Sequence, residues 1–159
     1  GLVTIFRLPR MEKKEIEKTI SENMLCRIAF KGAEYPYIAP FQYVYMKGIL
    51  YFHLTEYGKK MRLLKDDKRV CVEIEDYSRD LSEYRFISLR GALKIVSDPQ
   101  ERAEAIKRMR EIGMQRISEN FLGAHGLKRE EGWSSFTPRR ASLIVKLNNI
   151  VEEIGLKSP

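Results

Sequence analysis

The sequence of 159 residues holds only two histidines, two cysteines and one tryptophan, and it has no long hydrophobic run. Two histidines without a paired-cysteine motif give no spacing typical of a metal site, so we expect no bound metal. No apolar stretch approaches the roughly 20 residues that span a bilayer, and residues 1–10 lack the apolar core of a signal peptide. These absences predict a cytoplasmic protein that does not interact with a membrane.

The common catalytic motifs are also absent. The chain contains no Gly-x-Ser-x-Gly, no phosphate-binding Walker loop and no Gly-x-Gly-x-x-Gly. No nucleophile stands out, and we therefore assign no catalytic residue. If the protein catalyses a reaction, we expect a cofactor to supply the reacting atoms.

The two cysteines, Cys26 and Cys71, each lie in a short apolar stretch of β-like composition. Disulfides are rare in a reducing cytoplasm. We expect both side chains to be small buried hydrophobes.

The composition indicates a globular protein, with 43% hydrophobic and 32% charged residues, and its length suits a single domain over residues 1–159. The net charge of +7 fits attraction either to nucleic acid or to a ligand that carries a phosphate. Basic residues alternate with acidic ones along the expected helix 99–118, and no nucleic-acid-binding motif is present. Nucleic acid is therefore the less favoured partner.

Hydrophobic periodicity predicts one helix, three strands, a short helix, two strands, a long helix and a last strand. Because hairpins follow one another along the chain, we expect an antiparallel sheet closed into a β-barrel, with helices at its ends. A segment over residues 119–139, rich in glycine, serine and charge, is long enough to suggest a functional loop. The expected helices cover residues 11–24, 58–66 and 99–118, and the expected strands cover 25–31, 35–46, 49–55, 69–76, 84–97 and 141–150.

The long helix has an apolar stripe, which predicts the face that packs against the core. Its members are Ala103, Ile106, Met109, Gly113, Met114 and Ile117.

The most informative stretch follows the third expected strand, where Thr55, Gly58, Lys59 and Lys60 lead into a short amphipathic helix. The first N–H groups of a helix have no intrahelical partner and carry partial positive charge. A lysine at this end opposes the helix dipole by roughly 0.3–1 kcal/mol, so two adjacent lysines suggest a compensating anion. The pattern predicts a phosphate site, and two solvated lysines are the alternative interpretation.

The strand before this motif alternates in character. Leu50, Phe52 and Leu54 form one face, which we expect to fill the barrel. Tyr51, His53 and Thr55 form the other face, which would line a groove leading to the lysines. A histidine in the middle of a strand is as consistent with a structural role as with ligand contact.

The second expected strand places Tyr37, Phe41, Tyr43 and Tyr45 on one face. Such aromatic residues suit a flat heterocycle, and ordinary sheet packing explains them equally well. Pro40 has no N–H and therefore interrupts the ladder, which leaves a backbone group free to meet a ligand.

Taken together, these segments resemble the flavin-binding split-barrel proteins related to pyridoxamine 5′-phosphate oxidase, in particular the branch of nitroimidazole-resistance reductases. The order and spacing of the segments carry the resemblance. They are residues 7–31, 35–43, 51–53, 58–60 with Leu64, 69–73 and 84–91.

The resemblance implies a six-stranded antiparallel split β-barrel that forms a homodimer, with FMN in the groove between the subunits. By position, Thr55, Lys59 and Lys60 would hold the FMN phosphate, and His53 and Leu54 would lie along the ribityl chain or the ring edge. The residues that would border the isoalloxazine ring are Pro40, Phe41, Gln42 and Tyr43.

The implied activity is that of an FMN-dependent oxidoreductase, which passes electrons from a reduced donor to a small acceptor such as a nitroaromatic compound or a quinone. The alternative is a protein that binds flavin, deazaflavin F420 or haem without turnover, and a basic nucleic-acid-binding barrel is less favoured. Phe86 and Gln42 depart from the pattern of the nitroimidazole branch and leave the substrate open. Trp133, Phe136 and Arg139 either cap the flavin or belong to a packed or disordered loop.

Overall fold

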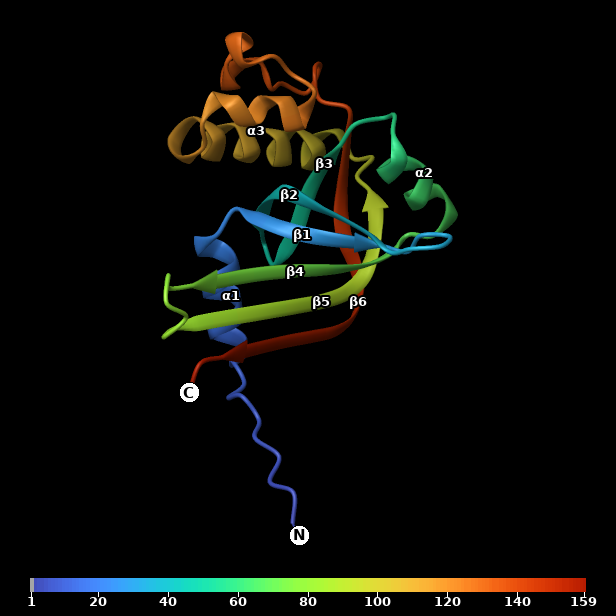
Figure 1. Ribbon diagram of the computed structural model, residues 1–159. Coiled ribbons are helices and arrows are strands. Elements are labelled where there is room, and N and C mark those ends of the chain that lie inside the picture. The colour runs from blue at the N-terminus through green and yellow to red at the C-terminus, as the bar shows by residue number, and fades with distance from the viewer. Residues whose placement is uncertain (1) are drawn as a thin grey trace.

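A computed structural model describes residues 2–159, and within them six antiparallel strands close into a barrel in the order β1-β2-β3-β6-β5-β4 (Figure 1). The predicted six-stranded antiparallel barrel is therefore confirmed. No helix within these residues is both long and apolar enough to cross a bilayer. The strands are β1 (Leu25–Phe30), β2 (Tyr37–Met46), β3 (Ile49–Leu54), β4 (Arg69–Tyr77), β5 (Tyr84–Ile95) and β6 (Leu143–Lys157).

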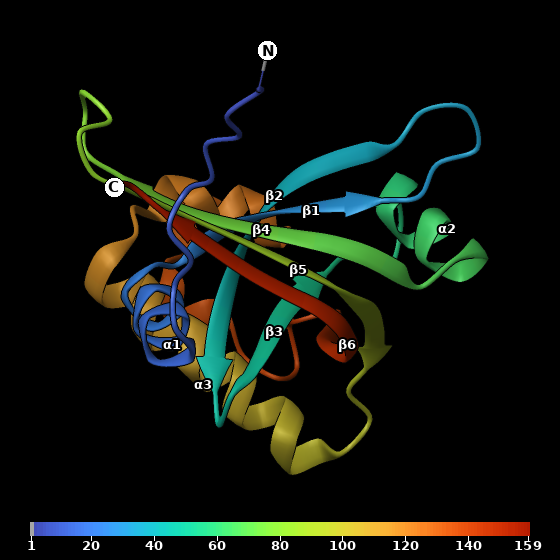
Figure 2. The same cartoon turned by 90° about the horizontal axis from the view of Figure 1, so that it is seen from below.

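Three α-helices and three short 3-10 helices surround the barrel. Figure 2 shows α1 and α2 toward opposite ends of the strands, while Figure 1 shows α3 and the segment after it stacked on one side. The 3-10 helices occupy most of the expected loop 119–139. The helices are α1 (Lys13–Glu22), α2 (Lys59–Asp66), α3 (Pro99–Arg116), η1 (Glu119–His125), η2 (Arg129–Glu131) and η3 (Trp133–Ser135).

The protein has two hydrophobic cores that share β2, β3 and the start of β6. The first core fills the barrel, and Ile16 and Ile20 of α1 pack into it. The second lies between the barrel wall and α3 with the segment that follows it. Strands covered on both faces need apolar or hydrogen-bonded side chains on both faces.

The alternation predicted for β3 is confirmed. Leu50, Phe52 and Leu54 point into the barrel core, and Tyr51 lies on the other face in the second core. That other face is buried as well, because α3 and the following segment cover it.

The aromatic face of β2 also points into the barrel. Phe41 and Tyr43 are buried there, and Tyr37 and Tyr45 pack against them. For most of this face the ordinary packing interpretation therefore holds.

The expectation for the cysteines is correct for Cys26 and wrong for Cys71. Cys26 is buried, whereas Cys71 is exposed. Val70 and Val72 point into the barrel, so the residue between them points outward because successive side chains of a strand alternate.

Strand β6 is longer than predicted, since it runs to Lys157 rather than ending at residue 150. The adjacent charged residues Glu152 and Glu153 are typical of a solvent-exposed loop. In the structure Glu152 pairs with Arg90 of β5 at 3.5 Å, and Glu153 pairs with Lys13 of α1 at 2.8 Å. These partners, distant in sequence, allow charged residues to continue the strand.

The buried face of α3 is rotated from the predicted stripe. Ala105, Ile106, Met109, Ile112 and Gly113 are buried, whereas the predicted Met114 is exposed. Gly113 belongs to both the predicted and the observed face, and Trp133 of η3 packs directly on it: a Cβ at residue 113 would lie 2.3 Å from two carbons of the indole ring.

We predict that Gly113→Ala destabilises the protein by roughly 1–3 kcal/mol, because overpacking against the indole outweighs the gain in helix propensity. Gly123→Ala is the matched control, since a Cβ there meets no atom within 4 Å. Urea unfolding of both variants measures the difference. Equal free energies of unfolding for the two variants would show that the Trp133 side chain can move aside without loss of stability.

Candidate functional site

A pocket lies where β2 and β3 meet the start of α2, and we call it the β2–β3 pocket. Its volume is about 180 Å³, and η1 closes one side. The lining residues are Pro40, Phe41, Gln42, His53, Leu54, Thr55, Lys60, Phe121, Ala124 and His125.

Most of the predicted cofactor-binding residues line this pocket. They are Pro40, Phe41, Gln42, His53, Leu54, Thr55 and Lys60. The exceptions are Tyr43 and Lys59. Tyr43 points into the barrel core, where its hydroxyl donates a hydrogen bond to the carbonyl of Ile20 at 2.6 Å. Burial raises the pKa of this phenol. Lys59 is also outside the pocket lining.

Both lysines at the start of α2 rest on aromatic rings. The ammonium of Lys59 lies 5.0 Å from the ring centroid of Tyr37, and that of Lys60 lies 4.8 Å from the ring centroid of Phe41. Within residues 2–159 neither lysine forms an ion pair with a carboxylate, although other lysines do. The Lys60 charge at the pocket is therefore not neutralised by a neighbouring side chain.

The turn that leads into α2 depends on glycine. Gly58 has a φ of 104°, a conformation that residues with a Cβ adopt only with strain. The Thr55 hydroxyl donates to the carbonyl of Tyr57 at 3.2 Å, so its oxygen stays on the pocket side of this turn. The sequence Thr-Glu-Tyr-Gly thus bends the chain so that Lys60 returns to the pocket.

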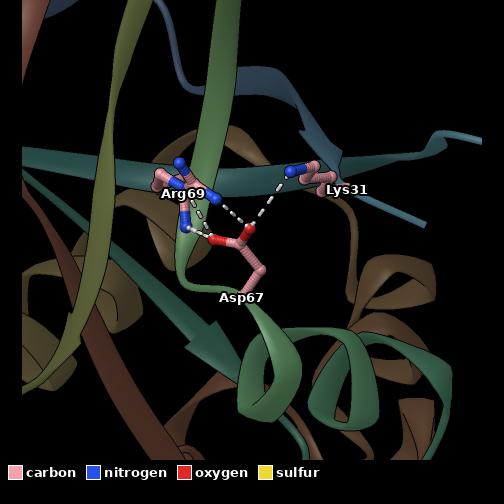
Figure 3. Close-up of polar contacts among 3 residues, drawn as sticks. All are labelled: Lys31, Asp67 and Arg69. Carbon is pink, nitrogen blue, oxygen red and sulfur yellow. Dashed lines mark hydrogen bonds and ion pairs between the residues drawn. The ribbon is translucent and has the colours of Figure 1, made fainter. Parts of the chain in front are cut away.

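The far end of α2 is fixed by charge. Asp67 accepts hydrogen bonds from the Arg69 guanidinium at 2.7 and 3.0 Å, and Lys31 approaches it at 3.7 Å (Figure 3). The hydrogen bonds from Arg69 hold the pKa of the Asp67 carboxyl well below its usual range. These contacts tie α2 to the end of β1 and the start of β4.

His53 and His125 form the polar wall of the pocket. Their Nδ1 atoms lie 3.0 Å apart. The Ser142 N–H donates to His53 Nε2 at 3.0 Å, so His53 carries its proton on Nδ1 and donates it to His125. His125 then accepts at Nδ1 and donates from Nε2 to the Gln42 amide oxygen at 2.7 Å. This chain of donors and acceptors assigns one neutral tautomer to each histidine.

The Gln42 amide extends the same hydrogen-bonded chain to α3. Its nitrogen donates to the carbonyl of Met109 at 3.1 Å. A second N–H proton on His53 would face the N–H group of Ser142, and a second one on His125 would face the N–H group of His53. Burial, with the nearby charges of His125 and Arg102, lowers the pKa of His53 to about 3, and burial lowers that of His125 to about 4.

Residues of η1 complete the pocket, and the sequence did not single them out. Phe121, Ala124 and His125 come from the segment for which only a functional loop was expected. The one signal in the sequence was that His125 is one of two histidines. Its contact with His53 joins positions 72 residues apart, which no local pattern reveals.

The three residues suggested as a flavin cap lie elsewhere. Trp133 and Phe136 are buried in the second core, and the indole N–H donates to the carbonyl of Ile117 at 3.0 Å. Phe136 packs against both histidine rings at centroid distances of 5.1 and 4.8 Å. Arg139 is exposed. Packing, the alternative interpretation, is therefore the correct one for the two aromatic residues.

The neutral histidine pair predicts that stability falls as pH drops from 7 to 5. The unfolded chain takes up protons near pH 6.5 while the folded chain stays neutral until about pH 4, so each histidine contributes a slope of up to about 1.4 kcal/mol per pH unit. Urea midpoints at pH 5, 6 and 7 measure this slope. His125→Gln should roughly halve it, and an unchanged slope in that variant would contradict the assignment.

The family of the chain is shown by sequence comparison. A family model for pyridoxamine 5′-phosphate oxidase matches residues 12–143. The chain belongs to this family. The match spans β1 to β5 and every residue of the β2–β3 pocket. Among curated proteins, none matches the sequence.

Solved structures share the fold at low sequence identity. A FAD-binding protein from Mesorhizobium loti superposes with a TM-score of 0.69 at 17% identity, covering 97% of this chain and all of that one. The FAD-binding protein from Mycobacterium smegmatis gives 0.62 at 14% identity, covering 94% and 97% of the two chains. A NimC/NimA family protein from Clostridium acetobutylicum gives 0.55 at 12% identity, covering 91% and 90%. These likenesses establish the split-barrel fold that the resemblance implied.

Proposed function

We propose that the protein binds FMN at the β2–β3 pocket and acts as an oxidoreductase toward a small electron acceptor. The observation that carries this proposal is the convergence of β2, β3 and the start of α2 on one pocket that has an unneutralised lysine at its edge. The solved relatives named for FAD have the same fold, and FAD and FMN share the flavin ring.

The phosphate end of the ligand fits the start of α2. Lys60 and the N–H groups of the first helical turn would offer charge and hydrogen-bond donors to the same anion, and the Thr55 hydroxyl would join them by turning away from the Tyr57 carbonyl. Lys59 lies one residue away and adds a second positive charge. A compact cationic site of this kind suits a terminal phosphate, which FMN has and FAD lacks. We therefore propose FMN as the cofactor and compare its affinity with that of FAD.

The ring end fits the apolar part of the pocket. Pro40, Phe41 and Leu54 offer flat apolar surface, while the nearby amide and imidazole groups are already paired with one another. Ligand pockets for molecules of this size usually measure about 300–1,000 Å³. At about 180 Å³ the β2–β3 pocket holds only part of FMN, so we propose that a second copy supplies the remaining wall in a homodimer.

The chain contributes binding and orientation to the reaction. Bound FMN would supply the hydride and electron transfer. Both histidines stay neutral near pH 7 and have no free proton to donate into the pocket. The protein therefore positions the ligand and limits access of water rather than moving protons.

We predict that Lys59→Ala combined with Lys60→Ala weakens FMN binding at least tenfold, because the phosphate loses two cationic partners. Arg62→Ala combined with Lys65→Ala is the matched control, since it removes the same charge from exposed positions of the same helix. Flavin fluorescence titration with FMN, FAD and riboflavin measures the affinities. Equal FMN affinity in the two double variants would contradict the proposed phosphate site.

A second candidate is a protein that binds flavin without turnover. It is favoured by the pairing of the polar wall of the pocket, since His53, His125 and Gln42 bond only to one another and to the backbone and leave no imidazole free to transfer a proton.

We expect photoreduced holoprotein to reoxidise faster when a nitroaromatic compound or a quinone is added under anaerobic conditions. Stopped-flow absorbance at the flavin band follows the reaction, with free FMN at the same concentration as the control. Reoxidation no faster than that of free FMN would favour the second candidate.

A further inference from the structure

The first residues of the chain form an extended apolar arm, residues 2–8. Leu2, Val3, Ile5 and Phe6 are 102%, 87%, 72% and 74% exposed. Disordered tails are typically polar and poor in β-branched and aromatic residues, whereas this arm is rich in them. An exposed cluster of this kind usually marks a surface that another molecule covers.

Both faces of the arm are apolar. In an extended chain Leu2 and Phe6 point to one side, and Val3 and Ile5 point to the other. An alternating pattern would fit a strand that lies on one surface. Apolar residues on both faces fit a strand that is covered on both sides.

The register at the base of the arm directs it away from its own barrel. Arg10 forms an antiparallel bridge with Leu156, and the Lys157 N–H donates to the carbonyl of Pro9 at 3.0 Å. An antiparallel course from this point carries residues 8 to 2 past the end of β6. Figure 1 shows the N-terminal segment leaving the body of the molecule in this way.

An apolar groove of about 590 Å³ lies on the outer face of the barrel, and we call it the outer groove. It lies at residues 149–151 of β6, so the arm would have to reverse direction to reach the groove of its own chain. Val151 is 82% exposed there. Its lining includes Lys31, Arg69, Cys71, Arg90 and Val151.

Three cations at the groove rim share two carboxylates. Arg69 and Lys31 both pair with Asp67 (Figure 3), and Arg90 pairs with Glu152. These pairs hold the charges at the rim, and the floor of the groove is apolar. An apolar segment is therefore the matching occupant.

We propose that the arm of one copy docks in the outer groove of a second copy, and that the second copy returns the same contact. Such an exchange is isologous and closes as a two-fold dimer. The four exposed side chains present on the order of 600 Å² per arm. Two docked arms would bury about 1,200 Å² of arm surface, and the groove surface that they cover brings the total above the roughly 1,200 Å² at the lower end of stable interfaces. The inference rests on the proposed homodimer but not on flavin binding.

Exposed Cys71 provides a built-in probe, because it lies in the groove while the second cysteine, Cys26, is buried. We expect single cysteines placed at Val3, Thr4, Ile5 or Phe6 to form disulfide-linked dimers with Cys71 under mild copper–phenanthroline oxidation. The same variants carrying Cys71→Ser are the matched controls. Non-reducing electrophoresis and peptide mass spectrometry identify which cysteines are joined.

The mass of the protein in solution provides the second measurement. We expect two variants to weaken dimerisation at least tenfold in analytical ultracentrifugation: the double variant Ile5→Asp with Phe6→Asp, and the single variant Val151→Asp. The control Thr4→Asp should weaken it less. Ile5, Phe6 and Val151 are exposed in the single chain. Their replacement therefore removes no core contact, and circular dichroism should show unaltered folding.

The outcomes separate the two proposals. Dimers joined through Cys71, together with weakened dimers in both Asp variants, would support arm exchange. Arm exchange would be overturned if the wild-type protein is a dimer that forms no Cys71-linked product and the Asp substitutions leave its dimerisation unchanged. The proposed homodimer would then remain supported. A disulfide within one chain would place the arm in its own groove and overturn the exchange. A monomeric wild-type protein would overturn both.

Discussion

The hydrogen-bonded chain through His53, His125 and Gln42 is the interaction on which the pocket depends. It starts at the backbone of Ser142 and ends at the backbone of Met109, and so it connects β3, η1 and β2 to the segment before β6 and to α3. Each member donates once to the next. Removing one member would leave a buried polar group without a partner, at a cost of about 1–3 kcal/mol.

This chain is needed because β2 and β3 are buried on both faces. A polar side chain between two apolar cores has no water to bond with, and in residues 2–159 every buried side-chain nitrogen or oxygen has a hydrogen-bond partner. The second core supplies the partners for Gln42 and His53 through α3 and η1. The same contacts hold Phe121 and Ala124 at the mouth of the pocket, so packing and site geometry have one origin.

Much of the architecture followed from the sequence, because alternation and turn chemistry act over a few residues. The inward face of Leu50, Phe52 and Leu54 is an example. The motif at Lys59 and Lys60, combined with the family resemblance, located the start of α2 and most of the pocket. Strand boundaries near glycine and proline were accurate to within a few residues.

What could not be predicted depends on contacts between distant parts of the chain. Trp133 packs on Gly113 from a separate segment, a contact that the local pattern of α3 does not reveal. The partners of Glu152 and Glu153 decide where β6 ends. The exposure of Cys71, by contrast, follows from alternation, because Cys71 shares a face of β4 with the charged Glu73.

The lysines on their aromatic rings have a consequence for recognition. A free lysine side chain samples many rotamers, and a ligand that recruits it must restrict that motion at a cost in affinity. The rings of Tyr37 and Phe41 already confine the two ammonium groups while leaving their charge unshared with any carboxylate. An anion at the proposed phosphate site would therefore meet ammonium groups whose rotamers are already restricted, and it would lose less binding energy in ordering them.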